Sequence, residues 1–196
     1  KVDPENEKDV DYPYYVTAHE VAHQWWANQV VGADVQGATL LSESLSQYTA
    51  LMVMKKKLGA NQMKKFLRYE LDRYLMGRSF ESKKELPIYR VENQQYIHYN
   101  KGTLVTYALA DYVGEATFNR GLKAFFDKFR FKAAPYPTSR DLLLALREAI
   151  PVEQHSLLVD WFEQITLYSV RCDEAKLKKR DDGKYEVTIE VVVEKT

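Results

Sequence analysis

The chain has 196 residues, enough for one domain with a sizeable hydrophobic core or for one domain and part of a second. Its 28 basic and 28 acidic side chains balance, and a net charge of zero argues against a nucleic-acid-binding protein. The single cysteine, Cys172, excludes an internal disulfide and a metal site made of several cysteines, and no apolar run approaches the roughly 18 residues that span a bilayer.

The first half of the chain is predicted to be helical after a polar lead. Residues 1–12 are expected to form a loop, and because the chain begins with Lys1 we interpret it as a piece of a larger protein. Apolar residues that recur every three to four positions then predict helices at about 14–28, 39–58 and 61–76. The side chains expected to face inward from the third helix are Phe66, Leu67, Leu71 and Leu75.

The second half is predicted to hold further helices and then strands. A long ordered loop is expected at 77–97, which contains a proline. Helices are predicted at about 102–113, 116–129, 138–150 and 152–167, with Thr138 or Ser139 as the cap of the third. Residues 170–194 alternate apolar and polar side chains around an Asp-Asp-Gly turn, which predicts a β hairpin. A lone hairpin is marginally stable, so we expect it to belong to a larger β module.

The segment HEVAHQWW, residues 19–26, carries the pattern His-Glu-x-x-His on the first predicted helix. His19 and His23 are four residues apart, so both imidazoles can reach one metal ion, with Glu20 beside it. Zinc lowers the pKa of a bound water towards about 7, and a carboxylate can then take its proton. The alternatives are a chance match and a structural zinc site, although structural sites usually close with four protein ligands.

A third zinc ligand is expected from a carboxylate on the next helix. Glu43 is the only acidic residue between Asp34 and Glu70, and it lies in an otherwise apolar stretch. An unpaired carboxylate is costly to bury there, and a metal ion would compensate it. Two alternatives stay open: that Glu43 is a carboxylate favoured by the dipole at a helix start, and that Asp34 in the preceding loop is the ligand.

The chain resembles the gluzincin aminopeptidases of the aminopeptidase N type. The segments that carry the resemblance are HEVAHQWW at 19–26, LSESL at 41–45 where the family has Leu-Asn-Glu-Gly-Phe, and YNKG at 99–102 where it has Tyr-x-Lys-Gly. The resemblance implies that His19, His23 and Glu43 bind one Zn²⁺ per chain, that Glu20 is the general base, and that the Tyr99 hydroxyl stabilises the oxyanion. Tyr99 could instead be one of many tyrosines that simply pack, and His98, its neighbour in a segment expected to be extended, is expected to point away.

The resemblance also implies the fold and the function. The fold would be mainly α, the helical part of a thermolysin-like catalytic domain over 13–168, with the start of a β-strand module at 169–196. The protein would be a zinc metallopeptidase, aminopeptidase-like, acting on peptide substrates. Part of the sequence, including RVENQQYIHYNKG, is similar to peptidase domains attached to bacterial ABC-type permeases, which implies a soluble domain of a bacterial membrane protein that also contains a permease portion.

The sequence departs from the family pattern at three points. One extra residue separates His23 from Glu43, and Ser-Glu-Ser replaces Asn-Glu-Gly. The family's Gly-x-Met-Glu-Asn segment, whose glutamate binds the substrate α-amine, has no match before His19. Exopeptidase specificity and activity of this fragment alone are therefore left open. The alternatives are a non-cleaving peptide-binding or regulatory domain of a membrane transporter, and a zinc hydrolase that acts on a non-peptide substrate.

Overall fold

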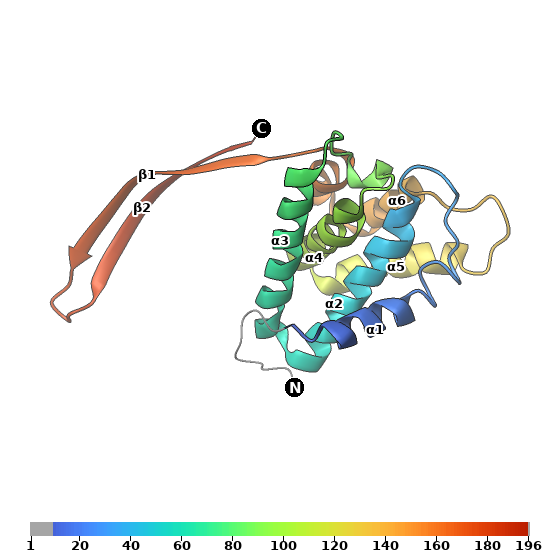
Figure 1. The fold of residues 1–196 in the computed structure, drawn as a ribbon, viewed down its shortest axis with the longest axis horizontal. Helices are drawn as coiled ribbons and strands as arrows, with labels where there is room; N and C mark the ends of the chain where they lie inside the picture. Colours follow the sequence, from blue (N-terminus) through green and yellow to red (C-terminus); the bar gives the residue numbers. More distant parts are fainter. Residues whose placement is uncertain (1–9, 196) are drawn as a thin grey trace. The chain divides into compact units, whose positions relative to one another are not determined.

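The protein is represented by a computed structural model that describes residues 10–195 (Figure 1). These residues divide into two units, one up to Gln164 and one from Ile165, and each is considered by itself. Most of the expected polar lead, residues 1–12, falls outside the described part of the chain. The first unit is helical and the second is a two-stranded hairpin, which confirms the mainly α fold with a C-terminal β hairpin.

The helical unit is built, over the residues described, from seven α-helices and several shorter helical turns. The α-helices are α1 (Tyr12–Ala22), α2 (Leu45–Leu58), α3 (Met63–Phe80), α4 (Gly102–Val113), α5 (Glu115–Phe129), α6 (Ser139–Ala149) and α7 (His155–Leu158). The shorter turns are η1 (Leu40–Ser44), η2 (Ala60–Gln62), η3 (Ile88–Arg90), η4 (Tyr96–Lys101), η5 (Val152–Gln154) and η6 (Val159–Glu163). The helices predicted at 102–113, 116–129 and 138–150 are confirmed, with Thr138 as the cap of α6.

Helix α2 lies at the centre of this unit and is buried on more than one face. Leu45 and Tyr48 belong to the larger core cluster, which α4, α5 and α6 complete. Leu51 and Met54 belong to a second cluster, which they share with side chains of α1 and α3. A helix that is apolar on several faces is stable only inside a protein, so the others pack around α2.

The first helix is shorter than predicted, because it ends at Ala22 and not near residue 28. Asn28 donates both its backbone N–H and its side-chain amide to the carbonyl of His23, at 3.2 and 2.8 Å, and this closes a turn. The turn buries Trp26, whose ring packs edge-on against Phe126 of α5 with 5.8 Å between centroids. His23 therefore lies at the end of α1 and not in its middle.

Helix α3 presents a different face to the interior from the one predicted. Leu71 and Leu75, expected to face inward, are 43% and 50% exposed. Its buried side chains include Met63, Phe66, Glu70 and Tyr74. The prediction is confirmed for Phe66, which is buried, and for Leu67, which packs against the same core cluster. It was wrong for Leu71 and Leu75, because it counted only apolar side chains, whereas Glu70 and Tyr74 find hydrogen-bond partners inside the unit.

Two other predicted boundaries also differ. The loop expected at 77–97 is shorter, since α3 continues to Phe80, the turn η3 interrupts the loop, and η4 begins at Tyr96. Gly77 allows the chain at Tyr96 to pack closely against α3, because a Cβ at position 77 would lie 2.4 Å from Cβ of Tyr96. The helix predicted at 152–167 ends at Glu163, before the β-branched pair Ile165 and Thr166, which favours extended backbone.

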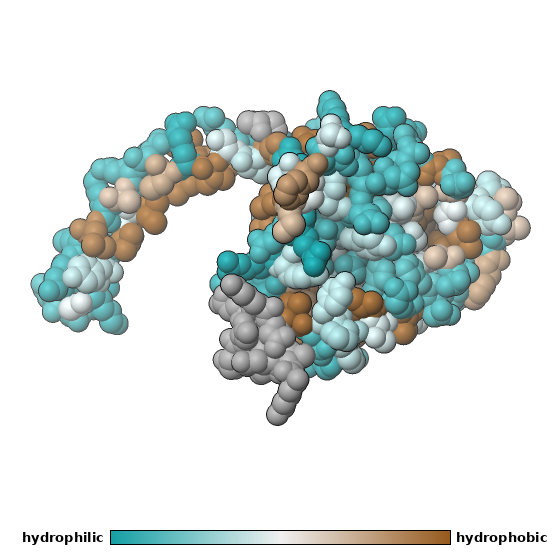
Figure 2. Space-filling model, viewed as in Figure 1, coloured by the Kyte–Doolittle hydropathy of each residue, from teal (hydrophilic) through white to brown (hydrophobic). Residues whose placement is uncertain are grey.

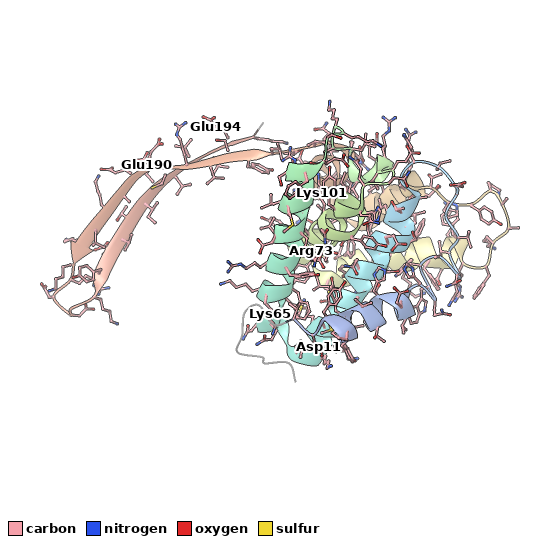
Figure 3. All side chains as sticks on the ribbon, in the orientation of Figure 1. Asp11, Lys65, Arg73, Lys101, Glu190 and Glu194 are labelled. Carbon is pink, nitrogen blue, oxygen red and sulfur yellow. The ribbon has the colours of Figure 1, made fainter. Side chains whose placement is uncertain are left out.

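The second unit is the predicted hairpin of β1 (Tyr168–Lys179) and β2 (Tyr185–Lys195), which pair antiparallel with one bulge after Cys172. Its apolar cross-strand pairs are Val170 with Val193, Cys172 with Val191, Ala175 with Ile189 and Leu177 with Val187. They form a row along the hairpin (Figure 2), while Glu190 and Glu194 of β2 project from the opposite side (Figure 3). The alternation of apolar and polar side chains therefore produces the predicted strand pair, but almost every residue of the hairpin is exposed.

Among the described residues, no helix has both the length and the apolar character that crossing a membrane requires.

Candidate active site

Helix α1 and its C-terminal cap residue carry the first three residues of the candidate site, His19, Glu20 and His23. It begins after Asp11, whose side chain accepts the N–H of Tyr14 at 3.4 Å, and it has Pro13 in its first turn. Four-residue spacing places the imidazoles of His19 and His23 on one side of the helix end, with ring centroids 4.6 Å apart. His19 is buried and His23 half-buried.

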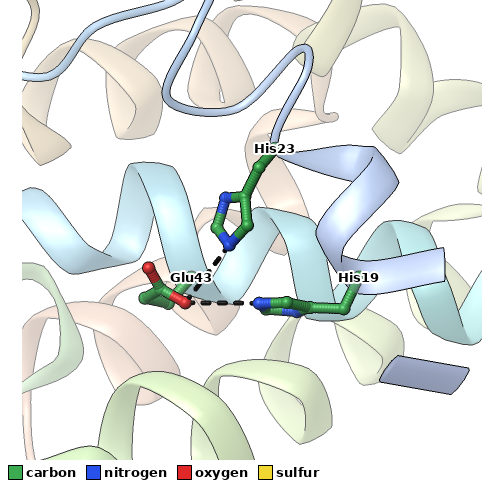
Figure 4. A group of neighbouring side chains, drawn as sticks. All are labelled: His19, His23 and Glu43. Carbon is green, nitrogen blue, oxygen red and sulfur yellow. Dashed lines mark ion pairs between the residues drawn. The ribbon is translucent and has the colours of Figure 1, made fainter. Parts of the chain in front are cut away.

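Glu43 completes a group of three potential metal ligands (Figure 4). It lies in η1, a π-helical turn that leads into α2. Its Oε2 atom is 3.3 Å from Nε2 of His19 and 3.6 Å from Nε2 of His23. The extra residue between His23 and Glu43 therefore does not keep the three side chains apart. Asp34, the other ligand considered, is exposed and is not part of this group.

The hydrogen bonds of His23 orient its ring for metal binding. Nδ1 lies 3.0 Å from the carbonyl oxygen of Trp26 and 3.1 Å from Oγ of Ser46. Because a carbonyl only accepts, Nδ1 carries a proton, and Nε2 is the ring nitrogen that faces Glu43 and can bind a metal. A metal-bound histidine typically has its second nitrogen held in this way. Two imidazole nitrogens and one carboxylate oxygen that converge form a donor set that suits zinc.

The charges of the site act on the carboxyl group of Glu43 and the hydroxyl of Tyr99. Burial acts to raise the pKa of Glu43, but hydrogen bonds from His19 and Tyr99 and the charges of both histidines outweigh it, and the pKa lies below its ordinary value. Burial, a hydrogen bond to Glu43 and the charges of Glu43 and Glu20 raise the pKa of Tyr99 to about 12. Tyr99 is therefore a protonated donor at neutral pH.

Tyr99 lies beside the three potential ligands, with its ring centroid 5.8 Å from that of His19. Its segment, η4, is a π-helical turn, so the extended conformation expected there was wrong. The rings of His98 and Tyr99 consequently contact each other, with 4.5 Å between centroids, and do not point apart. Nδ1 of His98 is buried without a hydrogen-bond partner among the described atoms.

The Lys-Gly pair after Tyr99 fixes the position of η4. Lys101 donates to the buried carboxylate of Glu85 at 2.5 Å, and Arg78 of α3 pairs with the same carboxylate at 2.8 Å. Gly102 lies so close to η1 that a Cβ there would be 2.4 Å from Oγ of Ser44. The motif residues thus hold the tyrosine segment against α3 on one side and against the Glu43 segment on the other.

A pocket of about 350 Å³ adjoins the site. Glu20 and Tyr99 line it together with His19, so the proposed base and the proposed oxyanion donor face one space. Aromatic side chains of α1 and α3, among them Tyr12 and Tyr69, form other parts of the wall.

Glu70, Gln47 and Asn100 also line this pocket, and the sequence interpretation assigned no role to them. A signal for Glu70 does exist in the sequence. It is one helical turn from both Phe66 and Tyr74, so it shares their face of α3. A method that looks only for apolar side chains does not detect a buried carboxylate such as this one.

Residues 2–162 match the family model described as the peptidase family M1 domain. Among curated proteins, the chain is 27% identical to human endoplasmic reticulum aminopeptidase 2 over 61% of this chain and 13% of that protein. It is 26% identical to probable aminopeptidase 1 of Sulfurisphaera tokodaii over 74% of this chain and 19% of that protein.

Among solved structures, the M1 zinc metallopeptidase of Deinococcus radiodurans has 27% identity and a TM-score of 0.60, covering 78% of this chain and 33% of that one. A mutant of that enzyme bound to a Tyr-Ser-Ala substrate has 25% identity and a TM-score of 0.59, covering 75% and 32%. The chain thus spans less than a fifth of these curated relatives and about a third of these structures. Since the family model covers most of its residues, the chain belongs to peptidase family M1.

Proposed function

We propose that the chain is the zinc-binding catalytic part of a metallopeptidase, aminopeptidase-like, that hydrolyses peptide bonds. The observation that carries this proposal is the convergence of His19, His23 and Glu43 next to Glu20 and Tyr99. The M1 relatives support it, because those curated proteins are named aminopeptidases and those structures zinc metallopeptidases.

The residues would share the chemistry as follows. His19, His23 and Glu43 would hold Zn²⁺, which when bound acts as a Lewis acid towards water and a peptide carbonyl. Glu20, exposed at the pocket, would accept the proton of the attacking water and pass a proton to the leaving amine. Tyr99 would donate its hydroxyl proton in a hydrogen bond to the oxygen that becomes negatively charged.

The donor set is tested by elemental analysis of wild type and Glu43→Ala, purified in parallel. We expect about one zinc per wild-type chain, as in other single catalytic sites, and a large loss in the variant because only two ligands remain. Glu148→Ala, which removes an exposed glutamate of α6, is the matched control and should keep its zinc. Wild type that binds no zinc, even when zinc is supplied, would contradict the proposal.

The role of Glu20 is tested with Glu20→Gln, assayed on aminoacyl and peptide substrates in the parent protein and in this chain. Loss of a general base typically lowers the rate about 10²- to 10⁴-fold, and zinc content should not change. Turnover at the wild-type rate would exclude this role. The non-cleaving alternative predicts zinc and peptide binding without hydrolysis in the parent protein, and the named aminopeptidase relatives do not favour it.

Two further proposals concern the protein of which this chain is a part. We propose that 13–168 is a fragment of a thermolysin-like catalytic domain and that 169–196 begins a β-strand module, whose other strands would cover the apolar row of the hairpin. We propose that the parent is a bacterial membrane protein with a permease portion, supported by the resemblance at 90–102. Recovery of the native protein in the membrane fraction tests the second proposal, and recovery in the soluble fraction alone contradicts it.

A further inference from the structure

Glu70 is a fully buried carboxylate on α3 that the mechanism above does not use. Its Oε1 accepts hydrogen bonds from the hydroxyl of Tyr15 at 2.9 Å and from the amide of Gln47 at 3.3 Å. Its Oε2 accepts one from the amide of Asn100 at 2.6 Å. These three donors come from three different segments of the chain.

Each of these segments also carries a residue of the proposed site. Tyr15 is one turn before His19 on α1, Gln47 is one turn after Glu43 on α2, and Asn100 directly follows Tyr99. One carboxylate therefore connects the helix of the two histidines, the helix that follows Glu43 and the segment of the tyrosine. The lining of the pocket beside Glu20 includes Glu70 itself.

The placement is costly for the fold, which points to a role beyond packing. Removing a carboxylate from water and surrounding it with neutral donors is less favourable than burying an apolar side chain of similar size. Burial accordingly raises the pKa of Glu70, although hydrogen bonds from Asn100 and Tyr15 and the charge of Arg73 act in the opposite direction. Arg73 lies one turn along α3 and stacks on Tyr69 at 4.7 Å.

Apart from the hydrogen bond between the Tyr99 hydroxyl and Glu43, the other anchors of the tyrosine segment leave its pocket side to Glu70. Ser44 donates to the carbonyl of His98 at 2.5 Å, and Lys101 is held by Glu85. Asn100, the residue next to Tyr99, is joined to the wall of the pocket by its hydrogen bond to Glu70. Among the described residues, no other hydrogen bond found for Asn100 does this. Loss of this bond would free the pocket side of η4 while its other side stays attached.

We propose that Glu70 is a positioning residue: it holds Asn100, and through it Tyr99, in register with the histidines of α1. This inference rests on the proposed function. Misplacement of a catalytic group by about 1 Å lowers a rate by about 10²-fold. Glu70 would thus act on the rate of the reaction and not on the retention of zinc, because neither histidine nor Glu43 bonds to it directly.

The test compares Glu70→Met, which keeps the volume and removes the acceptors, with Glu70→Gln, which keeps one acceptor oxygen. Both are made in the parent protein loaded with zinc, and kcat, KM and zinc content are measured at a temperature where each variant is folded. We expect Glu70→Met to lower kcat about 10- to 100-fold with KM within about 3-fold and zinc unchanged. Glu70→Gln should retain much more of kcat. The matched control is Asp72→Asn, which removes an exposed carboxylate from the same helix and should behave as wild type.

A cycle with Asn100→Ala shows whether the effect passes through that residue. If it does, the double variant Glu70→Met/Asn100→Ala should lose no more of kcat than the more impaired single variant. Losses that simply multiply would separate Glu70 from Asn100 and overturn the proposal. So would wild-type kcat in Glu70→Met, or a fall in kcat that matches a fall in bound zinc.

Hydrogen–deuterium exchange of residues 96–101 gives a readout that needs no activity. Exchange there should rise in Glu70→Met and not in Asp72→Asn, since only the former releases η4. If the wild-type parent binds zinc but cleaves no peptide, the proposed function fails, and the exchange result still decides whether Glu70 holds this segment. Equal exchange in wild type and Glu70→Met would overturn the proposal whatever the activity.

Discussion

The helical unit and the hairpin differ in what their apolar side chains contact. In the helical unit, Leu51 and Met54 of α2 are 0% exposed and lie among side chains from other helices. In the hairpin, Ile189 and Val191 are 56% and 52% exposed, although they alternate and pair as a strand requires. A correct local pattern therefore produces a strand pair, but burial free energy needs a second layer.

The polar residues of the two units differ in the same way. Glu70 and Glu85 of the helical unit are buried, and their partners are 7 to 55 positions away in sequence. The ion pairs of the hairpin are exposed and mostly local, such as Arg171 with Asp173. Exposed pairs contribute at most about 1 kcal/mol. The buried long-range polar contacts of Glu70 and Glu85 and the proposed site thus occur in the same unit, where packed helices hold distant side chains together.

The largest expected effect on stability is for Phe125→Ala, in α5. Phe125 is 0% exposed in the main core and packs against Phe129 at 5.1 Å between ring centroids. Its removal should lower the free energy of unfolding by about 3–5 kcal/mol, since the cavity cannot fully close. Urea unfolding followed by the helical circular dichroism signal measures this loss. A change below about 1 kcal/mol would mean that the core is less closely packed than described.

A smaller effect is expected at the start of α6. The carboxylate of Asp141 accepts the backbone N–H of Thr138 at 2.8 Å and its hydroxyl at 2.9 Å. Asp141→Ala removes both bonds and should cost about 1 kcal/mol, a typical value for a helix cap. Asp141→Asn keeps one acceptor oxygen and should cost less. Equal unfolding midpoints for wild type and Asp141→Ala would show that this cap does not contribute.

The buried carboxylate of Glu70 should make the helical unit sensitive to pH over a limited range. Its pKa is raised in the folded state, so the folded protein binds a proton more tightly than the unfolded chain does. The stabilisation from this proton is complete below the unfolded pKa of about 4.3 and is lost as pH rises through the folded pKa. Between these two pKa values, wild type should lose stability relative to Glu70→Gln as pH increases. Urea unfolding of both proteins at several pH values measures this difference. A difference that is constant with pH would contradict a raised pKa.

The smallest effect is expected in the hairpin itself. Ile189→Ala removes an exposed side chain whose cross-strand neighbour is Ala175. In this chain it should change the free energy of unfolding of the helical unit by no more than about 0.5 kcal/mol. The same substitution in the parent protein should be clearly destabilising if further strands cover the row. Equal effects in both would argue against the proposed β module.

The sequence by itself determined the features that depend on neighbours along the chain. The spacing of His19 and His23 follows from the pitch of one helix, and alternation with a turn at Gly183 is enough for a hairpin. The residues of the proposed site could be predicted from the sequence because they lie in short motifs. The residues that share a helix could also be placed relative to one another.

Only the tertiary structure decided how these segments meet. Whether Glu43 reaches the histidines depends on the path of residues 24–42, and the end of α1 at Ala22 depends on where Trp26 can be buried. The inward face of α3 could not be inferred from its leucines, because Glu70 is stabilised there by donors from α1, α2 and η4. Hydrogen bonds between distant segments stabilise the fold only after the packed helices have excluded water from them. No local sequence pattern therefore predicts them.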